Sequence, residues 1–125
     1  MKNIILGSVL AIAAVASLSA NATPLCAGGA AGDATTAVGV GTFVKVAFTP
    51  KCSANVFLDG IDSTSTLYVV AAGSAKGKRI FAGSTAGGSV SPVGTDCAAS
   101  GCTAGEVTTA AGAAETAAAG TGTGT

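Results

Sequence analysis

Four cysteines are the residues of this 125-residue chain whose type and spacing bear most directly on chemistry: Cys26, Cys52, Cys97 and Cys102. A zinc site would need C-x-x-C pairs or histidines, but the chain has no histidine and its cysteines are separated by 25, 44 and 4 residues. The last spacing also differs from a C-x-x-C redox motif. An even number of cysteines in a chain that begins like an exported protein predicts two disulfides. Among the three possible connectivities we favour Cys26–Cys52 with Cys97–Cys102, because the second pair closes a tight local turn.

Catalytic chemistry has few candidate groups in this sequence. Without histidine, the usual base for a serine or cysteine nucleophile is missing. Asp59 and Asp62 form the only close carboxylate pair, and we interpret them as turn residues that cap backbone amides rather than as an acid and a base. The segment that they bound lacks the alternating oxygen ligands of a calcium loop. The sequence therefore predicts a protein that is not an enzyme and that has no cofactor and no metal site.

A short basic run, Lys76-Gly77-Lys78-Arg79, is the strongest concentration of charge in the chain. The segment 73–78 differs from a phosphate-binding loop, because it has one residue too few between its glycines and is followed by arginine where serine or threonine is required. We interpret it as a hairpin turn. Its cations are expected to be solvated, and contact with an acidic polysaccharide or with lipid headgroups is the alternative.

The N-terminus has the three parts of an export signal. A single lysine precedes an apolar stretch over residues 4–18, and residues 20–22 (Ala-Asn-Ala) form a cleavage site. We therefore expect residues 1–22 to be a signal peptide of the kind typical of bacterial export. The apolar stretch is shorter than the roughly 20 residues that cross a bilayer as a helix, so no transmembrane anchor is expected. The protein is predicted to be extracellular or at the cell surface, with the periplasm as the alternative.

The composition of residues 23–125 limits the size of the hydrophobic core and the classes of partner that the protein could bind. Only 19 of these residues are Leu, Ile, Val or Phe, a content at which a core is hard to fill. Gly, Ala, Thr and Ser dominate the rest and bury little area, so the disulfides should carry part of the stability. Five Lys or Arg stand against six Asp or Glu, which indicates neither a nucleic-acid partner nor a membrane-surface patch.

Strand periodicity is concentrated between residues 38 and 93. Bulky residues and threonine recur at every second position from Val38 to Phe48, and Pro50 stops the run. Four further short strands are expected at residues 54–58, 66–72, 78–82 and 89–93, with turns at Asp59-Gly60 and at residues 73–77. The sequence therefore predicts an all-β fold, a small antiparallel sandwich or incomplete barrel of about five to six short strands stapled by disulfides.

Low-complexity segments flank the strand region and divide the mature chain into three parts. We expect a Gly/Ala/Thr-rich arm at residues 23–37, a disulfide-stapled β domain at residues 38–102 and an Ala/Gly/Thr-rich tail at residues 103–125. The tail contains helix-forming alanines, but Gly112 and Gly120 interrupt them and no amphipathic stripe of bulky residues is present. The tail is therefore predicted to be mobile.

Two classes of function are consistent with these features. The first is a structural subunit of a cell-surface or extracellular assembly, such as a fibre, a pilus-like filament or a matrix. In that class the extended segment before Gly39 would add an edge strand to a neighbouring subunit, so self-association is expected. The alternative is a monomeric secreted or periplasmic binding module for a glycan, a surface or a host protein. The structural subunit is the function that we expect.

Overall fold

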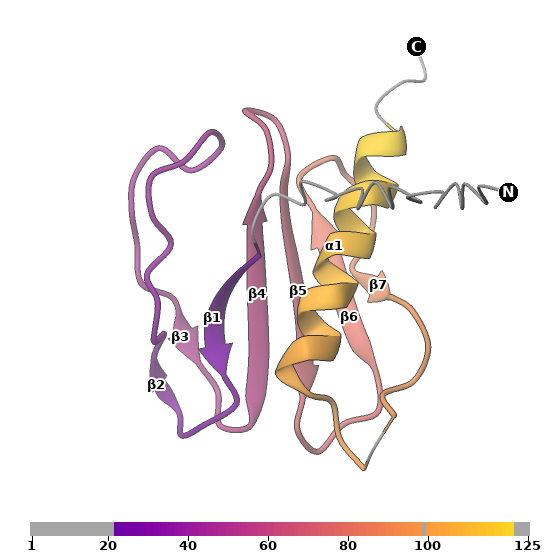
Figure 1. Cartoon of the computed structure of the whole chain (residues 1–125). Helices are drawn as coiled ribbons and strands as arrows, with labels where there is room; N and C mark the ends of the chain where they lie inside the picture. Colours follow the sequence, from indigo (N-terminus) through magenta and orange to yellow (C-terminus); the bar gives the residue numbers. More distant parts are fainter. Residues whose placement is uncertain (1–21, 99, 122–125) are drawn as a thin grey trace, which may run out of the picture.

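An open five-stranded antiparallel sheet organises the protein (Figure 1). The computed structural model describes residues 22–98 and 100–121. The strand order is β1-β4-β5-β6-β7, and β2 and β3 form a separate two-stranded sheet. The elements in chain order are β1 (Thr23–Ala27), β2 (Gly32–Asp33), β3 (Lys51–Cys52), β4 (Val56–Asp62), β5 (Tyr68–Ser74), β6 (Ile80–Ser84), β7 (Ser91–Pro92) and α1 (Ala104–Thr121). The expected small, disulfide-stapled and mostly β fold is confirmed, and its sheet does not close into a barrel.

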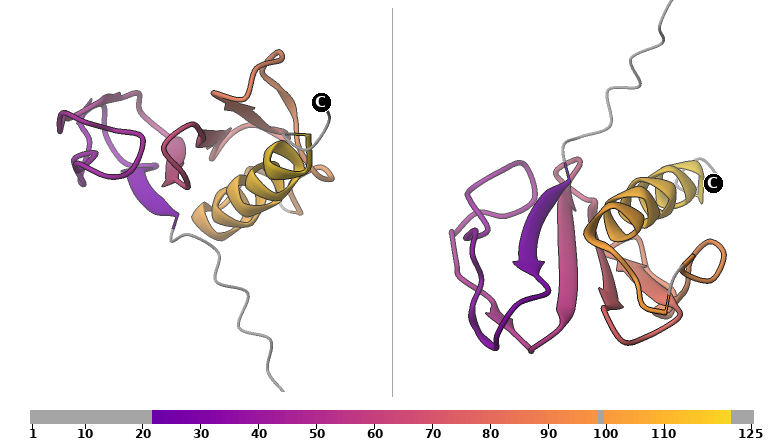
Figure 2. Two further views of the ribbon diagram at one scale, coloured as in Figure 1. Left: turned by 90° about the horizontal axis from the view of Figure 1, so that it is seen from above. Right: turned by 60° about the horizontal axis from the view of Figure 1, so that its bottom comes forward.

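The sheet lies between α1 on one face and the connection from β1 to β4 on the other (Figure 2). Because successive side chains of a strand point to opposite faces, each central strand contributes to both layers. The cluster on the other face contains Leu25, Cys26 and Val38. The larger cluster, between the sheet and α1, is built from Ile61, Leu67, Val69, Ala71, Ile80, Ala82, Cys97, Cys102, Val107, Ala110 and Ala111.

Helix α1 corrects the expectation of a mobile tail, although residues 122–125 of that tail lie outside the described residues. The helix begins with a capping box, in which the Glu106 N–H donates to Thr103 Oγ1 (3.3 Å) and the Thr103 N–H donates to Glu106 Oε2 (2.8 Å). Its buried face contains Val107 and several alanines. Alanine has the highest helix propensity, and its small side chain lets the helix approach the sheet closely. The helix therefore needs no stripe of bulky residues.

The prediction of a long strand from Val38 to Phe48 is wrong. These two residues form a single antiparallel bridge, with N–H···O distances of 2.8 and 3.1 Å, and the chain between them makes an excursion. The Asp62 carboxylate accepts hydrogen bonds from the backbone N–H groups of Phe43 (2.8 Å) and Val44 (2.9 Å), which hold the chain where it turns back. The alternating pattern therefore belongs to the two limbs of a loop.

Residues 23–37 are engaged with their own domain and do not form a separate arm. β1 pairs with β4 at the edge of the main sheet, and β2 pairs with β3. The Thr35 N–H donates to the carbonyl oxygen of Leu25 (3.2 Å). Of the expected signal peptide, residues 1–21 lie outside the described residues, whereas Ala22 packs against the helix-side cluster. The layered structure thus includes residues on both sides of the expected 38–102 domain.

Three expected strands are present but begin and end later in the sequence than predicted, as β4, β5 and β6. β4 continues through Asp59 and Gly60, where a turn was expected. A β-carbon at position 60 would overlap the hydroxyl oxygen of Tyr68, so a larger residue there would displace the tyrosine ring. The strand expected at residues 89–93 is reduced to the two residues of β7.

Both disulfides join the pairs that the sequence favoured. Cys26–Cys52 ties β1 to β3 with a Cα–Cα distance of 5.7 Å, and Cys97–Cys102 closes the loop before α1 with a Cα–Cα distance of 5.0 Å. Each disulfide therefore fastens one of the two layers that cover the sheet. Within the part of the chain that the structure describes, no helix combines the length and the apolar character needed to cross a membrane.

Candidate interaction surfaces

The two carboxylates that the sequence places close together lie on opposite faces of β4. Asp59 is 2% exposed beneath α1, where its Oδ2 accepts a hydrogen bond from Thr108 Oγ1 (2.5 Å). Asp62 faces the other layer and accepts hydrogen bonds from loop residues. The expected role of capping backbone amides in a turn is thus wrong for Asp59. Asp62 does bind backbone amides, but those of a loop about twenty residues earlier in the chain.

Asp62 holds the middle of the β1–β4 connection in place. Its carboxylate accepts hydrogen bonds from Thr42 Oγ1 (2.7 Å) and from the N–H groups of Phe43 and Val44. Partial burial favours the protonated form, but together these hydrogen bonds outweigh it and hold the pKa of Asp62 below its ordinary value. Burial and the nearby Asp62 charge raise the pKa of Tyr68. The Asp62 carboxylate is therefore ionised when it binds the loop and holds it in its folded conformation.

Acid is expected to release residues 42–44. Because the folded-state pKa of Asp62 is depressed, its stabilising contribution is present above the ordinary value of 3.8 and is lost as the pH falls through the folded pKa. NMR should show the Val44 amide protected at about pH 6, with a protection factor, corrected for the intrinsic pH dependence of exchange, that falls only below pH 3.8. Asp62→Asn cannot ionise and should remove this pH dependence. A Val44 transition with a midpoint above 3.8 would contradict the assignment.

Three bulky apolar side chains of the β1–β4 connection face solvent. Val40 is 68% exposed, Val46 is 77% exposed and Phe48 is 53% exposed. We call these three residues the loop patch. The bridge between Val38 and Phe48 brings the limbs of the excursion side by side at its base, as Figure 1 shows at the left of the molecule. The loop patch therefore presents apolar area from a segment that is itself fastened to the sheet.

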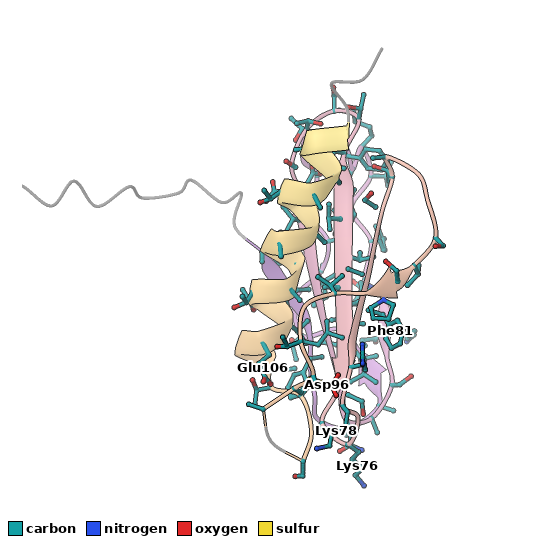
Figure 3. The ribbon with its side chains drawn as sticks, turned by 90° about the vertical axis from the view of Figure 1, so that its right-hand side faces the viewer. Lys76, Lys78, Phe81, Asp96 and Glu106 are labelled. Atoms are coloured by element: carbon teal, nitrogen blue, oxygen red, sulfur yellow. A yellow bond between two sulfur atoms is a disulfide. The ribbon has the colours of Figure 1, made fainter. Side chains whose placement is uncertain are left out.

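A second exposed surface lies on the sheet face opposite α1. Its hollow of about 450 Å³ is lined by residues from β4, β5, β6 and the β5–β6 turn, including Val56, Ala72, Lys78, Arg79 and Phe81. We call it the basic hollow. Figure 3 shows the Phe81 ring on the side of the sheet away from the helix, and Lys76 and Lys78 near the end of the β5–β6 turn. Phe81 is 46% exposed.

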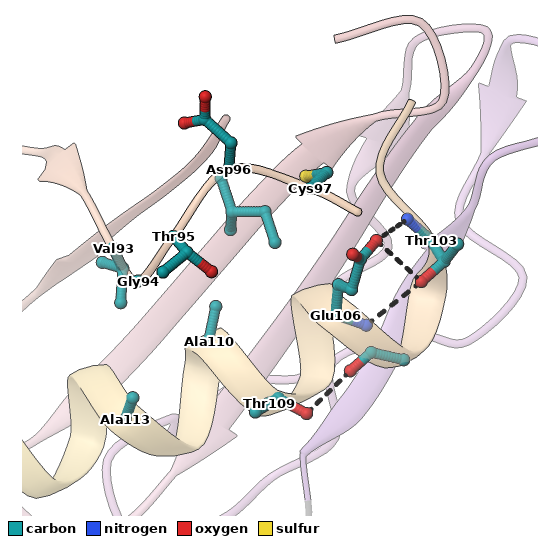
Figure 4. Close-up of a pocket in the computed structure, with 12 residues that line it drawn as sticks. Val93, Gly94, Thr95, Asp96, Cys97, Thr103, Glu106, Thr109, Ala110 and Ala113 are labelled. Atoms are coloured by element: carbon teal, nitrogen blue, oxygen red, sulfur yellow. Dashed lines mark hydrogen bonds between the residues drawn. The ribbon is translucent and has the colours of Figure 1, made fainter. Parts of the chain in front are cut away.

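A second hollow, of about 460 Å³, lies beside the first turns of α1 (Figure 4). Its carboxylates already have structural partners. Glu106 accepts hydrogen bonds from the N–H groups of Ala98 and Thr103 (both 2.8 Å) and from the Thr103 hydroxyl, which hold the pKa of Glu106 below its ordinary value. Asp96 pairs with Arg79 at 2.7 Å and points away from the hollow. The carboxylates at this hollow therefore fasten the disulfide loop to the start of α1 and to the β5–β6 turn.

Sequence reasoning found the cysteines and the basic run but missed the loop patch and the helix cap. The capping box was readable as Thr103-x-x-Glu106, a spacing that marks helix starts. The loop patch carried no such signal, because its alternating valines have the pattern of a half-buried strand.

Among the described residues, no group of three or more His, Cys, Asp or Glu side chains could hold a metal ion. The loop patch and the basic hollow each present exposed apolar side chains that a partner could contact. Comparisons of the chain with protein-family models, with curated proteins and with solved structures found no match.

Proposed function

We propose that this protein is an exported, non-enzymatic structural subunit of a cell-surface or extracellular assembly, and that its subunits associate through the loop patch. The observation that carries the proposal is the exposure of Val40, Val46 and Phe48 in a chain with few bulky residues. Full burial of such a side chain contributes about 1.5–3 kcal/mol, so these partly exposed residues would each add about 1–2 kcal/mol on association. Contact between subunits would bury these side chains and so be stabilised by that free energy.

The edges of the sheet favour this mode of contact over the strand addition that the sequence suggested. β1 contains Pro24 and a register irregularity between Pro24 and Cys26. β7 has two residues, and one of them is Pro92. Proline cannot donate a backbone hydrogen bond, and short or bulged edge strands are poor templates for pairing. Packing of apolar side chains is therefore the mode of association that we propose.

The proposal predicts concentration-dependent oligomers or filaments. The exported chain, purified with its disulfides formed, should show them in size-exclusion light scattering and negative-stain electron microscopy. The double substitution Val40→Ser and Val46→Ser should weaken association by about thirtyfold to several hundredfold, because it removes most of the apolar area of the loop patch. Since both side chains are exposed, the melting temperature should change little.

Val90→Ser is the matched control for this experiment. Val90 is 68% exposed, as Val40 is, but it lies in the connection before β7 and outside the loop patch. It should leave association within about twofold of the wild type. Equal losses from both sites would contradict the loop patch as the contact. A wild-type chain that stays monomeric at all concentrations would contradict the structural subunit and favour a monomeric binding module.

A further inference from the structure

The basic hollow has an excess of positive charge that the rest of the molecule does not share. Three of the five Lys and Arg residues after residue 22 lie within residues 76–79, whereas six Asp and Glu are distributed over the same mature chain. Among the residues that the structure describes, Asp96 alone forms an ion pair with the run, through Arg79 Nε. In the described parts of the chain, the ammonium groups of Lys76 and Lys78 have no hydrogen-bond or ion-pair partner. The local charge near the hollow is therefore positive although the mature chain is slightly acidic.

The hollow also presents an aromatic ring beside this charge. Phe81 lies opposite Ala72 in the β5–β6 ladder, and both residues line the hollow together with Val56. The ring is 46% exposed on an open sheet face. Lys78 and Arg79 line the same hollow. The apolar floor and the cationic groups thus come mainly from the β5–β6 hairpin, with Val56 of β4 beside them.

We infer that the basic hollow binds an acidic polysaccharide, with a sugar ring packed on Phe81 and its acidic substituents paired with Lys78 and Arg79. The apolar face of a pyranose ring packs well on an aromatic ring, which supplies a large contact area. Lysine and arginine form charge-assisted hydrogen bonds with carboxylate and sulfate oxygens. A polymer of acidic sugars offers both groups at short, repeated intervals.

The small number of cations and the position of the aromatic ring favour a polysaccharide over a membrane or a nucleic acid. Anionic membranes and nucleic acids are usually bound by larger basic clusters, of about four to eight Lys or Arg at membranes. Here there are three cations, and one of them already has an acidic partner. The aromatic ring lies on the face of the sheet rather than at a projecting tip. This site does not depend on the loop patch, so it adds a binding activity to the proposed structural role.

Titration calorimetry with polygalacturonate tests the inference. The exported chain should bind it at low salt and bind neutral dextran at least about tenfold more weakly, because dextran lacks the acidic groups. Lys78→Gln and Phe81→Ala should each reduce the affinity by about tenfold, since one removes a charge-assisted hydrogen bond and the other removes the apolar floor. NMR shifts caused by the polymer should be confined to residues 56 and 72–81.

Two matched controls keep the test specific. Lys45→Gln removes an exposed charge from the loop excursion, and Val90→Ala removes an apolar side chain that is 68% exposed in the connection before β7, outside both the loop patch and the basic hollow. Both should change the affinity by less than about twofold. An equal loss with Lys45→Gln, or undetectable binding of polygalacturonate, would overturn the inference. Binding to phosphatidylglycerol vesicles with no binding to the polymer would overturn it in favour of a membrane. Circular dichroism melting of each variant identifies any loss that comes from unfolding.

Discussion

Replacement of Gly101 by alanine is expected to destabilise the fold by about 2–4 kcal/mol, a large effect for the addition of one methyl group. A β-carbon at this position would overlap the backbone carbonyl group of Ala75. The loop cannot easily move aside. It is closed by Cys97–Cys102, and the N–H groups of these two cysteines donate to the carbonyl oxygens of Lys78 and Ser74, both at 2.9 Å. The added carbon would therefore separate the loop from the β5–β6 turn.

Gly105→Ala is the matched control, and its expected effect has the opposite sign. This glycine lies in the first turn of α1, and a β-carbon there would meet nothing within 4 Å. Alanine should stabilise the helix by up to about 1 kcal/mol, because glycine loses more backbone entropy on folding.

Urea unfolding of both variants measures the two effects, with thermal shifts of about 4–8 °C per kcal/mol for a domain of this size. If Gly101→Ala unfolds within 0.5 kcal/mol of the wild type, a threshold of about the usual scatter of surface substitutions, the loop does not pack on the turn as described.

The helix at residues 104–121 shows which part of the fold local patterns could predict. Its start was readable from Thr103 and Glu106, but its apolar face was not, because alanine contributes little to a hydrophobic stripe. What stabilises this helix is the sheet beneath it. Gly73 on β5 leaves room for Val107, since a β-carbon at position 73 would be 3.0 Å from a Val107 methyl group. That fit depends on residues 34 positions apart and has no local signature.

The segment from Val38 to Phe48 shows the opposite case, in which a strong local pattern was overridden. Its period of two is typical of a strand. The decisive contact is with Asp62, whose carboxylate binds the backbone of Phe43 and Val44 and competes with a continuous strand. Local sequence patterns cannot reveal that Asp62 binds this loop, because Asp62 lies about twenty residues further along the chain. The disulfide pairs were easier to predict, because the number of cysteines, their spacing and the expected compartment limit the possible pairings.

Loss of the Cys26–Cys52 disulfide is expected to destabilise the protein by about 3–4 kcal/mol, more than loss of Cys97–Cys102, for which about 2 kcal/mol is expected. The difference follows from the sequence separations of 26 and 5 residues, since a longer closed loop restricts the unfolded chain more. The double variants Cys26→Ser/Cys52→Ser and Cys97→Ser/Cys102→Ser, compared by urea unfolding, measure both values. Equal losses from the two variants would show that loop length does not set the stability.

Each of these two double variants should loosen a different one of the two layers that cover the sheet. Together they test whether the stability of one layer affects the proposed assembly. Among the described residues, the cluster on the loop side contains three buried residues, one of which is Cys26 itself. Without its disulfide, the β1–β4 connection should exchange its amide hydrogens before the sheet unfolds, because so small a cluster cannot hold a segment of this length. The loop patch would then lose its fixed position, and association should weaken. Cys97→Ser/Cys102→Ser should loosen the start of α1 and leave association intact. Light scattering of both variants therefore decides whether the first disulfide preserves the interface between subunits as well as the fold.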